Sequence, residues 1–143
     1  MQTEAGVEAF GQLIFGYSSA NESVQIPYVR VLKSGGVVVT APASAIQDLN
    51  PPVAREAPVY TDFHQKHVTV PGLRPGEILE YQAVTTTHTP LAPNEFWMEH
   101  RFLDTGVVLD DQLEVNIPRN RAVKLKTRPG HDAKITDEGE RRI

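Results

Sequence analysis

Cysteine is absent from this sequence, which excludes a disulfide framework, a thiolate zinc site and a thiol nucleophile within the chain. No apolar run approaches the ~20 residues that cross a bilayer as a helix, so we expect no membrane span. Residues 1–4 lack the basic and apolar regions of a signal peptide, and we interpret them as a start placed on an internal piece. Helical signals are limited to short turns, the first of them at residues 3–9, which leaves strands as the main element.

The remaining composition is that of an ordinary folded domain. The 143 residues are 40% hydrophobic and 22% charged, values close to the globular average, and this length supports one hydrophobic core. We therefore predict a single domain over residues 1–143. The net charge is −4, so counterion release would not favour binding of this chain to a polyanion. Nucleic acid is therefore not an expected partner.

Apolar and polar residues alternate along several segments of the chain. Period-two alternation is typical of a half-buried strand, and the 11 prolines and 10 glycines supply turns between the segments. The predicted strands cover residues 12–18, 23–33, 37–40, 64–70, 77–88, 96–102, 112–117 and 123–128. This pattern predicts an all-β fold, an antiparallel β-sandwich of about eight strands with long proline-rich loops.

Turn and loop residues add detail to this prediction. Residues 34–36, Ser-Gly-Gly, are typical of a hairpin turn, because glycine tolerates the positive φ that such turns require. Pro27 lacks a backbone donor, so we expect a sheet edge or a bulge there. Residues 42–58 hold four prolines and predict a long loop, with a short helical turn at 44–49 that Ser44 would cap.

The most specific stretch lies in the middle of the chain. Residues 57–62 read Ala-Pro-Val-Tyr-Thr-Asp, and residues 68–81 read Val-Thr-Val-Pro-Gly-Leu-Arg-Pro-Gly-Glu-Ile-Leu-Glu-Tyr. The Val-Arg-Val of residues 29–31, Asp48 and the Leu-Glu-Val-Asn-Ile-Pro of residues 113–118 fit the same pattern. Together they resemble a bacterial family, the domain of unknown function found N-terminal to transglutaminase-like domains in secreted or periplasmic proteins.

This resemblance spans residues 12–127, and its motifs are structural turns without reactive groups. It implies a β-sandwich similar to the N-terminal β domain of M1-type aminopeptidases. It also implies that a papain-like Cys-His-Asp domain normally follows, in a periplasmic or secreted protein. Residues 137–143 begin to resemble another strand and then stop, so we expect a fragment of a longer multidomain protein. An open sheet edge at this end could support a homodimer.

The histidines do not predict a metal site. His64 and His67 are three residues apart, a spacing that sends them to opposite faces of a strand. The other three lie in separate segments: His88, His100 and His131. We therefore interpret all five as structural or surface residues, with no metal and no cofactor expected.

No residue pattern indicates a catalytic centre either. No Gly-x-Ser-x-Gly frame positions a serine nucleophile. Asp110 and Glu114 share a predicted strand face with Gln112, opposite the apolar residues, as a solvated face does. Residues 119–128 hold five cations and no anion. This stretch either protects an outer strand from aggregation, which we favour, or binds an acidic polymer.

Three residues are the best candidates for contact with a partner or ligand: Tyr60, Asp62 and Trp97. Tyr60 and Asp62 either line a groove, or serve the loop itself through packing and hydrogen bonds to nearby amides, which we favour. On the strand predicted at 96–102, Phe96 should face the core, and Trp97 should point the other way.

We therefore predict a non-catalytic accessory module of a larger exported bacterial protein. It would pack against a transglutaminase-like thiol hydrolase domain of the same polypeptide, or present that domain's substrate or partner. A free-standing carbohydrate- or peptide-binding module that uses Trp97 and Tyr60 is the alternative. An autonomous hydrolase is a third hypothesis, which the sequence does not support with any site.

Overall fold

The computed structural model describes residues 1–50, 62–102 and 107–143. The chain divides into two compact units, Met1–Phe96 and Trp97–Ile143, which we call unit 1 and unit 2. Antiparallel strands dominate, with one α-helix, so the predicted all-β fold is confirmed. The single domain over residues 1–143 stays a prediction. Within the described residues, no helix is long and apolar enough to span a membrane.

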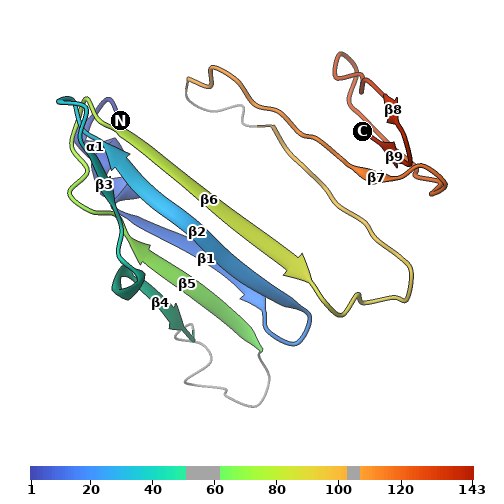
Figure 1. Ribbon diagram of the computed structural model, residues 1–143, viewed down its shortest axis with the longest axis horizontal. Coiled ribbons are helices and arrows are strands. Elements are labelled where there is room, and N and C mark those ends of the chain that lie inside the picture. The colour runs from blue at the N-terminus through green and yellow to red at the C-terminus, as the bar shows by residue number, and fades with distance from the viewer. Residues whose placement is uncertain (51–61, 103–106) are drawn as a thin grey trace. The chain divides into compact units, whose positions relative to one another are not determined.

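Unit 1 contains two three-stranded antiparallel sheets (Figure 1). Sheet A has the order β1 (Gln12–Ser18), β5 (Phe63–Thr69) and β4 (Ile46–Leu49). Sheet B has the order β3 (Val38–Thr40), β2 (Glu22–Leu32) and β6 (Ile78–Thr87). Five of the eight predicted strands are thus confirmed, with ends that differ by one residue at most.

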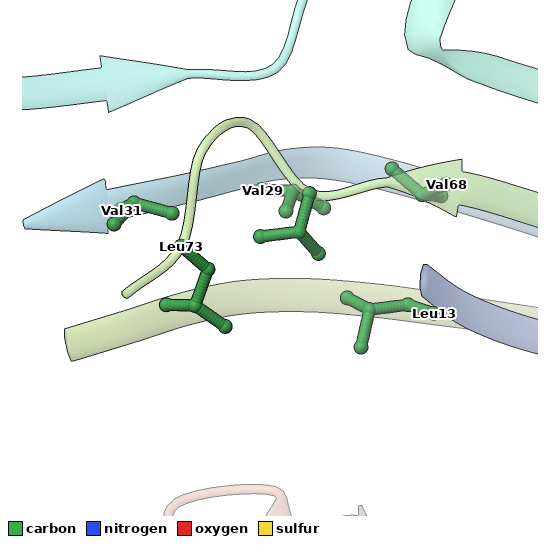
Figure 2. Close-up of a cluster of buried hydrophobic side chains, with 6 residues drawn as sticks. Leu13, Val29, Val31, Val68 and Leu73 are labelled. Carbon is green, nitrogen blue, oxygen red and sulfur yellow. The ribbon is translucent and has the colours of Figure 1, made fainter. Parts of the chain in front are cut away.

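The core of unit 1 joins these two sheets as a sandwich. Leu13 of β1 lies opposite Val68 of β5, and Val31 of β2 packs in the same cluster. Val31 and Val68 are 0% exposed. Figure 2 shows side chains from β1, β2, β5 and the turn after β5 converging on one cluster. Each buried aliphatic side chain stabilises the fold by about 1.5–3 kcal/mol relative to exposure, so this cluster is what holds sheets A and B together.

The turns and the bulge of unit 1 lie at glycine and proline residues. Gly72 and Gly76, in the connection from β5 to β6, have φ values of 58° and 85°, a region that L side chains rarely adopt. The hairpin from β2 to β3 is confirmed, with the Gly36 amide donating to the carbonyl of Lys33 at 2.9 Å. Pro27 lies in a β-bulge of β2, as expected, because the register with β6 shifts between Gln25 and Tyr28.

Two short elements flank these sheets. The predicted helical turn is confirmed as α1 (Glu4–Phe10), where the Thr3 hydroxyl accepts a hydrogen bond from the Gly6 amide at 3.1 Å. The helical turn expected at 44–49 is wrong beyond its start. A 3-10 turn covers Ala43–Ala45, and β4 follows at once. Pairing of Ile46 with the buried Val68 explains this outcome, because tertiary burial outweighs a weak local cap.

Unit 2 is a small sheet with long connections. Its strands are β7 (Ile117–Pro118), β8 (Asp137–Glu138) and β9 (Arg141–Arg142), in the order β7-β9-β8. The strands predicted at 96–102 and 123–128 are wrong for the described residues, and of 112–117 only Ile117 lies in a strand. The predicted core position of Phe96 is also wrong, since it is exposed together with Met98 and Phe102. Alternation permits a strand, but only pairing with a neighbour makes one.

Candidate functional site

Four polar side chains converge on the face of sheet A that also carries the core. The register pairs Tyr17 of β1 with His64 of β5, and Asp48 of β4 with Lys66 of β5. All four lie an even number of positions from core residues on their own strands or opposite them, so they share that face. We call this group the Asp48 cluster.

Asp48 is the centre of this cluster. Its Oδ2 atom accepts a hydrogen bond from the Tyr17 hydroxyl at 2.7 Å and from the Lys66 ammonium at 2.9 Å. Its Oδ1 atom lies 3.6 Å from Nδ1 of His64. The Tyr17 and His64 rings are 5.7 Å apart, and the Lys66 ammonium lies 5.9 Å from the centre of the Tyr17 ring. One carboxylate therefore joins three strands.

The surroundings shift two pKa values in the cluster. Burial, the hydrogen bond to Asp48 and the negative charge of Asp48 raise the pKa of Tyr17 to about 12. Burial also acts to raise the pKa of Asp48, but the hydrogen bonds from Lys66 and Tyr17 outweigh it, so the pKa of Asp48 is lowered. At neutral pH the carboxyl is thus ionised and the phenol neutral.

This arrangement suits a structural role better than acid–base chemistry. A general base or acid works best with a pKa near the operating pH, and both shifts move away from it. The Oδ2 atom of Asp48 already accepts hydrogen bonds from Tyr17 and Lys66. No local sequence pattern indicates this cluster, because Tyr17 and Asp48 are 31 residues apart and only the β1-β5-β4 register brings them together.

Asp62 holds the turn between β1 and β2. Its Oδ2 atom accepts hydrogen bonds from the Ser18 hydroxyl and, at 3.2 Å, from the Ala20 amide. Its backbone carbonyl accepts from the Ser19 amide at 2.9 Å. The Ser18 and Ala20 bonds lower the pKa of Asp62. Tyr60 lies outside the described residues, so a groove made by Tyr60 and Asp62 stays a prediction.

Trp97 is 67% exposed. Its neighbours Phe96 and Met98 are exposed as well, so the contrast between an inward and an outward side of this segment is not observed. Exposure alone therefore does not distinguish Trp97 from the apolar residues beside it. Its role as a contact residue stays a prediction.

The histidines of the described residues lie in different settings. His67 is opposite Ile14 on sheet A, so it faces away from His64 as expected. In unit 2, Nε2 of His100 lies 3.7 Å from Oδ1 of Asp111. The Phe102 ring meets the His100 ring edge-on, with 4.8 Å between the ring centres, and stacks on the His131 ring, with 5.7 Å between the ring centres. Among the described residues, no three His, Asp or Glu side chains gather as a metal site would need.

Unit 2 contains an apolar groove of about 700 Å³. Its aliphatic and aromatic lining includes Phe102, Leu113, Val115, Val123, Leu125 and Ile135. Val123, Leu125 and Thr127 line it, whereas Lys124 and Lys126 between them do not. The predicted alternation of residues 123–128 thus survives in an extended segment without sheet pairing.

Arginine pairs hold the small sheet of unit 2. Arg142 and Arg119 both contact Asp137, with Nε–Oδ distances of 2.8 and 3.2 Å. Arg141 donates to the side chain and the carbonyl of Asn116 at 2.6 and 2.9 Å. The hydrogen bond from Arg142 lowers the pKa of Asp137. At least one cation of the 119–128 stretch therefore has an internal structural partner.

Comparison with known proteins is consistent with this architecture. A crystal structure of a putative protease from Parabacteroides distasonis superposes with a TM-score of 0.58 at 20% sequence identity. The superposition covers 65% of this chain and 19% of that protein, so the chain corresponds to a small part of its length. At this identity the likeness shows the fold alone. No curated protein matches the sequence.

The match to a family extends over the whole chain. Residues 1–143 match a domain of unknown function, DUF3857. The β5-β6 connection with its two positive-φ glycines, and the paired sheets on either side of the core, are the structural counterpart of the sequence motifs in the middle of the chain. The chain belongs to the DUF3857 family of domains of unknown function.

Proposed function

We propose that this chain is a non-catalytic accessory module of a larger exported protein. It would pack against a transglutaminase-like thiol hydrolase domain of the same polypeptide, or present that domain's substrate. The observation that carries the proposal is the groove of unit 2, whose lining is dominated by apolar side chains. A large exposed apolar surface is typical of a packing or binding site.

The state of the polar clusters supports the same proposal. Asp48 and Asp62, the two carboxylates with the most contacts in sheet A and its turns, are both engaged by hydroxyl, amide or ammonium donors. Both have lowered pKa values, which makes them weak bases at neutral pH. The putative protease from Parabacteroides distasonis is consistent with a larger parent protein, since only 19% of it aligns.

Two measurements test this proposal. The reading frame around the coding segment should include a Cys, His and Asp domain of transglutaminase type, and a frame without one contradicts the proposal. The purified chain should not hydrolyse peptide, ester or amide substrates. Turnover that persists through purification and disappears in Asp48→Asn would reveal an autonomous hydrolase.

A second candidate function is a module that binds carbohydrate or peptide through Trp97. The observation that favours it is the 67% exposure of this aromatic ring. Trp97 is the sole tryptophan of the chain, so its fluorescence reports directly on contact. Titration with oligosaccharides and extended peptides should quench or shift this emission if the alternative is right. Trp97→Phe should then retain part of the affinity, and Trp97→Ala should lose it.

A further inference from the structure

Strand β6 forms one end of sheet B and is unusually long for an edge strand. It runs for 10 residues, Ile78–Thr87, and pairs with β2 along this length, from Leu32 opposite Ile78 to Glu22 opposite Thr87. Within the described part of the chain, no strand pairs with its other side. The backbone N–H and C=O groups along that side are a template for another strand.

The other edge strands of these sheets are shorter than β6, the longest of them being β1 of sheet A with 7 residues. At the opposite ends of the two sheets, β3 has 3 residues and β4 has 4. Proline follows each of them closely, at Pro42 and Pro51, and proline and short length both protect an edge from pairing. Strand β6 contains no proline, glycine, lysine or arginine.

The bulge of sheet B does not interrupt β6. Gln25 lies opposite Val84 and Tyr28 opposite Gln82, so Ile26 and Pro27 together face a single residue of β6. The extra residue therefore belongs to β2. Strand β6 remains regular, as pairing on its free side requires.

We propose that the free edge of β6 pairs antiparallel with β6 of a second copy of this chain, joining two copies of sheet B into one continuous sheet. A two-fold axis perpendicular to the sheet keeps each side chain on its own face, so residues of the same parity meet. This interface is independent of the accessory role proposed above. It uses a different edge from the C-terminal one, near residues 137–143, through which the sequence led us to expect a homodimer.

The side chains of β6 suit such self-pairing. With the axis at Gln82, Glu80 of one copy lies opposite Val84 of the other, and Ile78 lies opposite Thr86. No like charges meet, because Glu80 is the single charged residue of the strand. Its carboxylate is also paired within the copy, with two Arg30 nitrogens at 2.9 Å. Because β6 pairs with itself, the contact closes at two copies and does not propagate.

The test is the mass of the chain in solution as a function of concentration. Sedimentation equilibrium from micromolar to millimolar concentration should show a reversible monomer–dimer equilibrium. The double variant Gln82→Glu/Val84→Glu places acidic groups opposite each other and opposite Glu80 of the second copy. It should weaken the dimer by about tenfold or more.

A matched control exists on the short edge of sheet A. Gln47 and Leu49 of β4 repeat the pattern of Gln82 and Val84, and Leu49 and Val84 are both 38% exposed. The variant Gln47→Glu/Leu49→Glu should leave the dimer unchanged. A dimer weakened equally by both double variants, a larger oligomer, or a monomer throughout the concentration range would overturn the proposal.

Two further measurements test the proposal even if the acidic double variant does not fold. In the unmodified chain, hydrogen exchange should slow at residues 78–87 as concentration rises, and an unchanged exchange rate there contradicts the proposal. The single variants Val84→Lys and Val84→Glu should act in opposite directions, since Glu80 of the second copy faces this position. Equal effects would rule out the register centred on Gln82.

Discussion

Units 1 and 2 carry the same alternation of apolar and polar residues, but only unit 1 buries it. In unit 1, Val31 and Val68 are 0% exposed because β2 and β5 each have strand neighbours and a facing sheet. In unit 2, Val123 and Leu125 are 57% and 58% exposed although they alternate as regularly. The comparison teaches that alternation prepares a face, and that burial needs a second layer to cover it.

The largest expected difference comes from placing a charge on the buried face of unit 1 and, for comparison, on the open face of unit 2. Val31→Asp should destabilise the chain by more than about 4 kcal/mol, because an unpaired carboxylate would be buried in the core of unit 1. Val123→Asp, on the open face of unit 2, should change stability by about 0.5 kcal/mol or less. Urea unfolding followed by far-UV circular dichroism measures both. Equal losses would show that the two faces are buried alike.

Matched glycines give a second, smaller comparison. Gly76 in unit 1 and Gly130 in unit 2 have the same φ of 85°. An alanine methyl group would therefore strain both backbones equally before either turn relaxes. Gly76→Ala should cost about 1–2 kcal/mol, because the β5-β6 connection is anchored by the core at Leu73. Gly130→Ala should cost less, since its turn has room to relax.

Thermal unfolding of the two alanine variants decides the point, with Gly35→Ala as the control. Gly35 has no positive φ, and a methyl group added to its Cα would meet no other atom within 4 Å, so its replacement should leave the midpoint unchanged. A Gly130 variant as damaged as the Gly76 variant would contradict the difference between the units.

As the pH falls, the Asp48 cluster should lose its contribution to stability before the core of unit 1 is affected. The folded pKa of Asp48 is lowered, so its contribution is present above its unfolded pKa of about 3.9 and is lost as pH falls through the lower folded value. Asp48→Asn should remove about 0.5–1 kcal/mol at neutral pH, allowing for screening by water at this partly exposed site. It should also flatten the pH dependence below about pH 4.

Urea titrations at a series of pH values, from neutral to acidic, measure this effect. Asp137→Asn in unit 2 is the control, because Asp137 has a lowered pKa as well but lies in the small exposed sheet. Removal of the Asp137 carboxylate should leave the stability of unit 1 unchanged. An unchanged acid limb in Asp48→Asn would show that the cluster contributes nothing to stability.

The smallest expected effect is on the fluorescence of Trp97. Because Trp97 is 67% exposed, its emission maximum should shift little when the chain unfolds in urea. Acrylamide should quench it nearly as well before unfolding as after. Strong protection from acrylamide in the folded chain would show that the ring is covered, and would make unit 2 more like unit 1.

Much of unit 1 could be predicted from local sequence. The alternation at 12–18 and 64–70, the glycine turn at 34–36 and the bulge at Pro27 were all expected. Each depends on residues within one or two strands, so short-range chemistry is sufficient. Strand β4 was not expected as a strand, because its four residues have weak alternation and acquire their state from pairing with β5.

The candidate contacts were predictable only in part. Asp62 was expected to bond nearby amides, and it does so at Ala20. The Asp48 cluster gave no local signal, since its members come from three strands and meet through register. The two arginines that pair with Asp137 are 23 residues apart, and no spacing in the sequence indicates that they share one carboxylate.

The order of residues by itself determined the class of fold, the turn positions and the side of each strand that faces inward in unit 1. These properties follow from backbone sterics and from period-two alternation, which act over a few neighbouring residues. Only the tertiary structure decided which strands pair, and therefore where Tyr17, Asp48 and Lys66 meet and which edge remains open. Pairing joins segments that are distant along the chain, and its free energy depends on partners that no local pattern specifies.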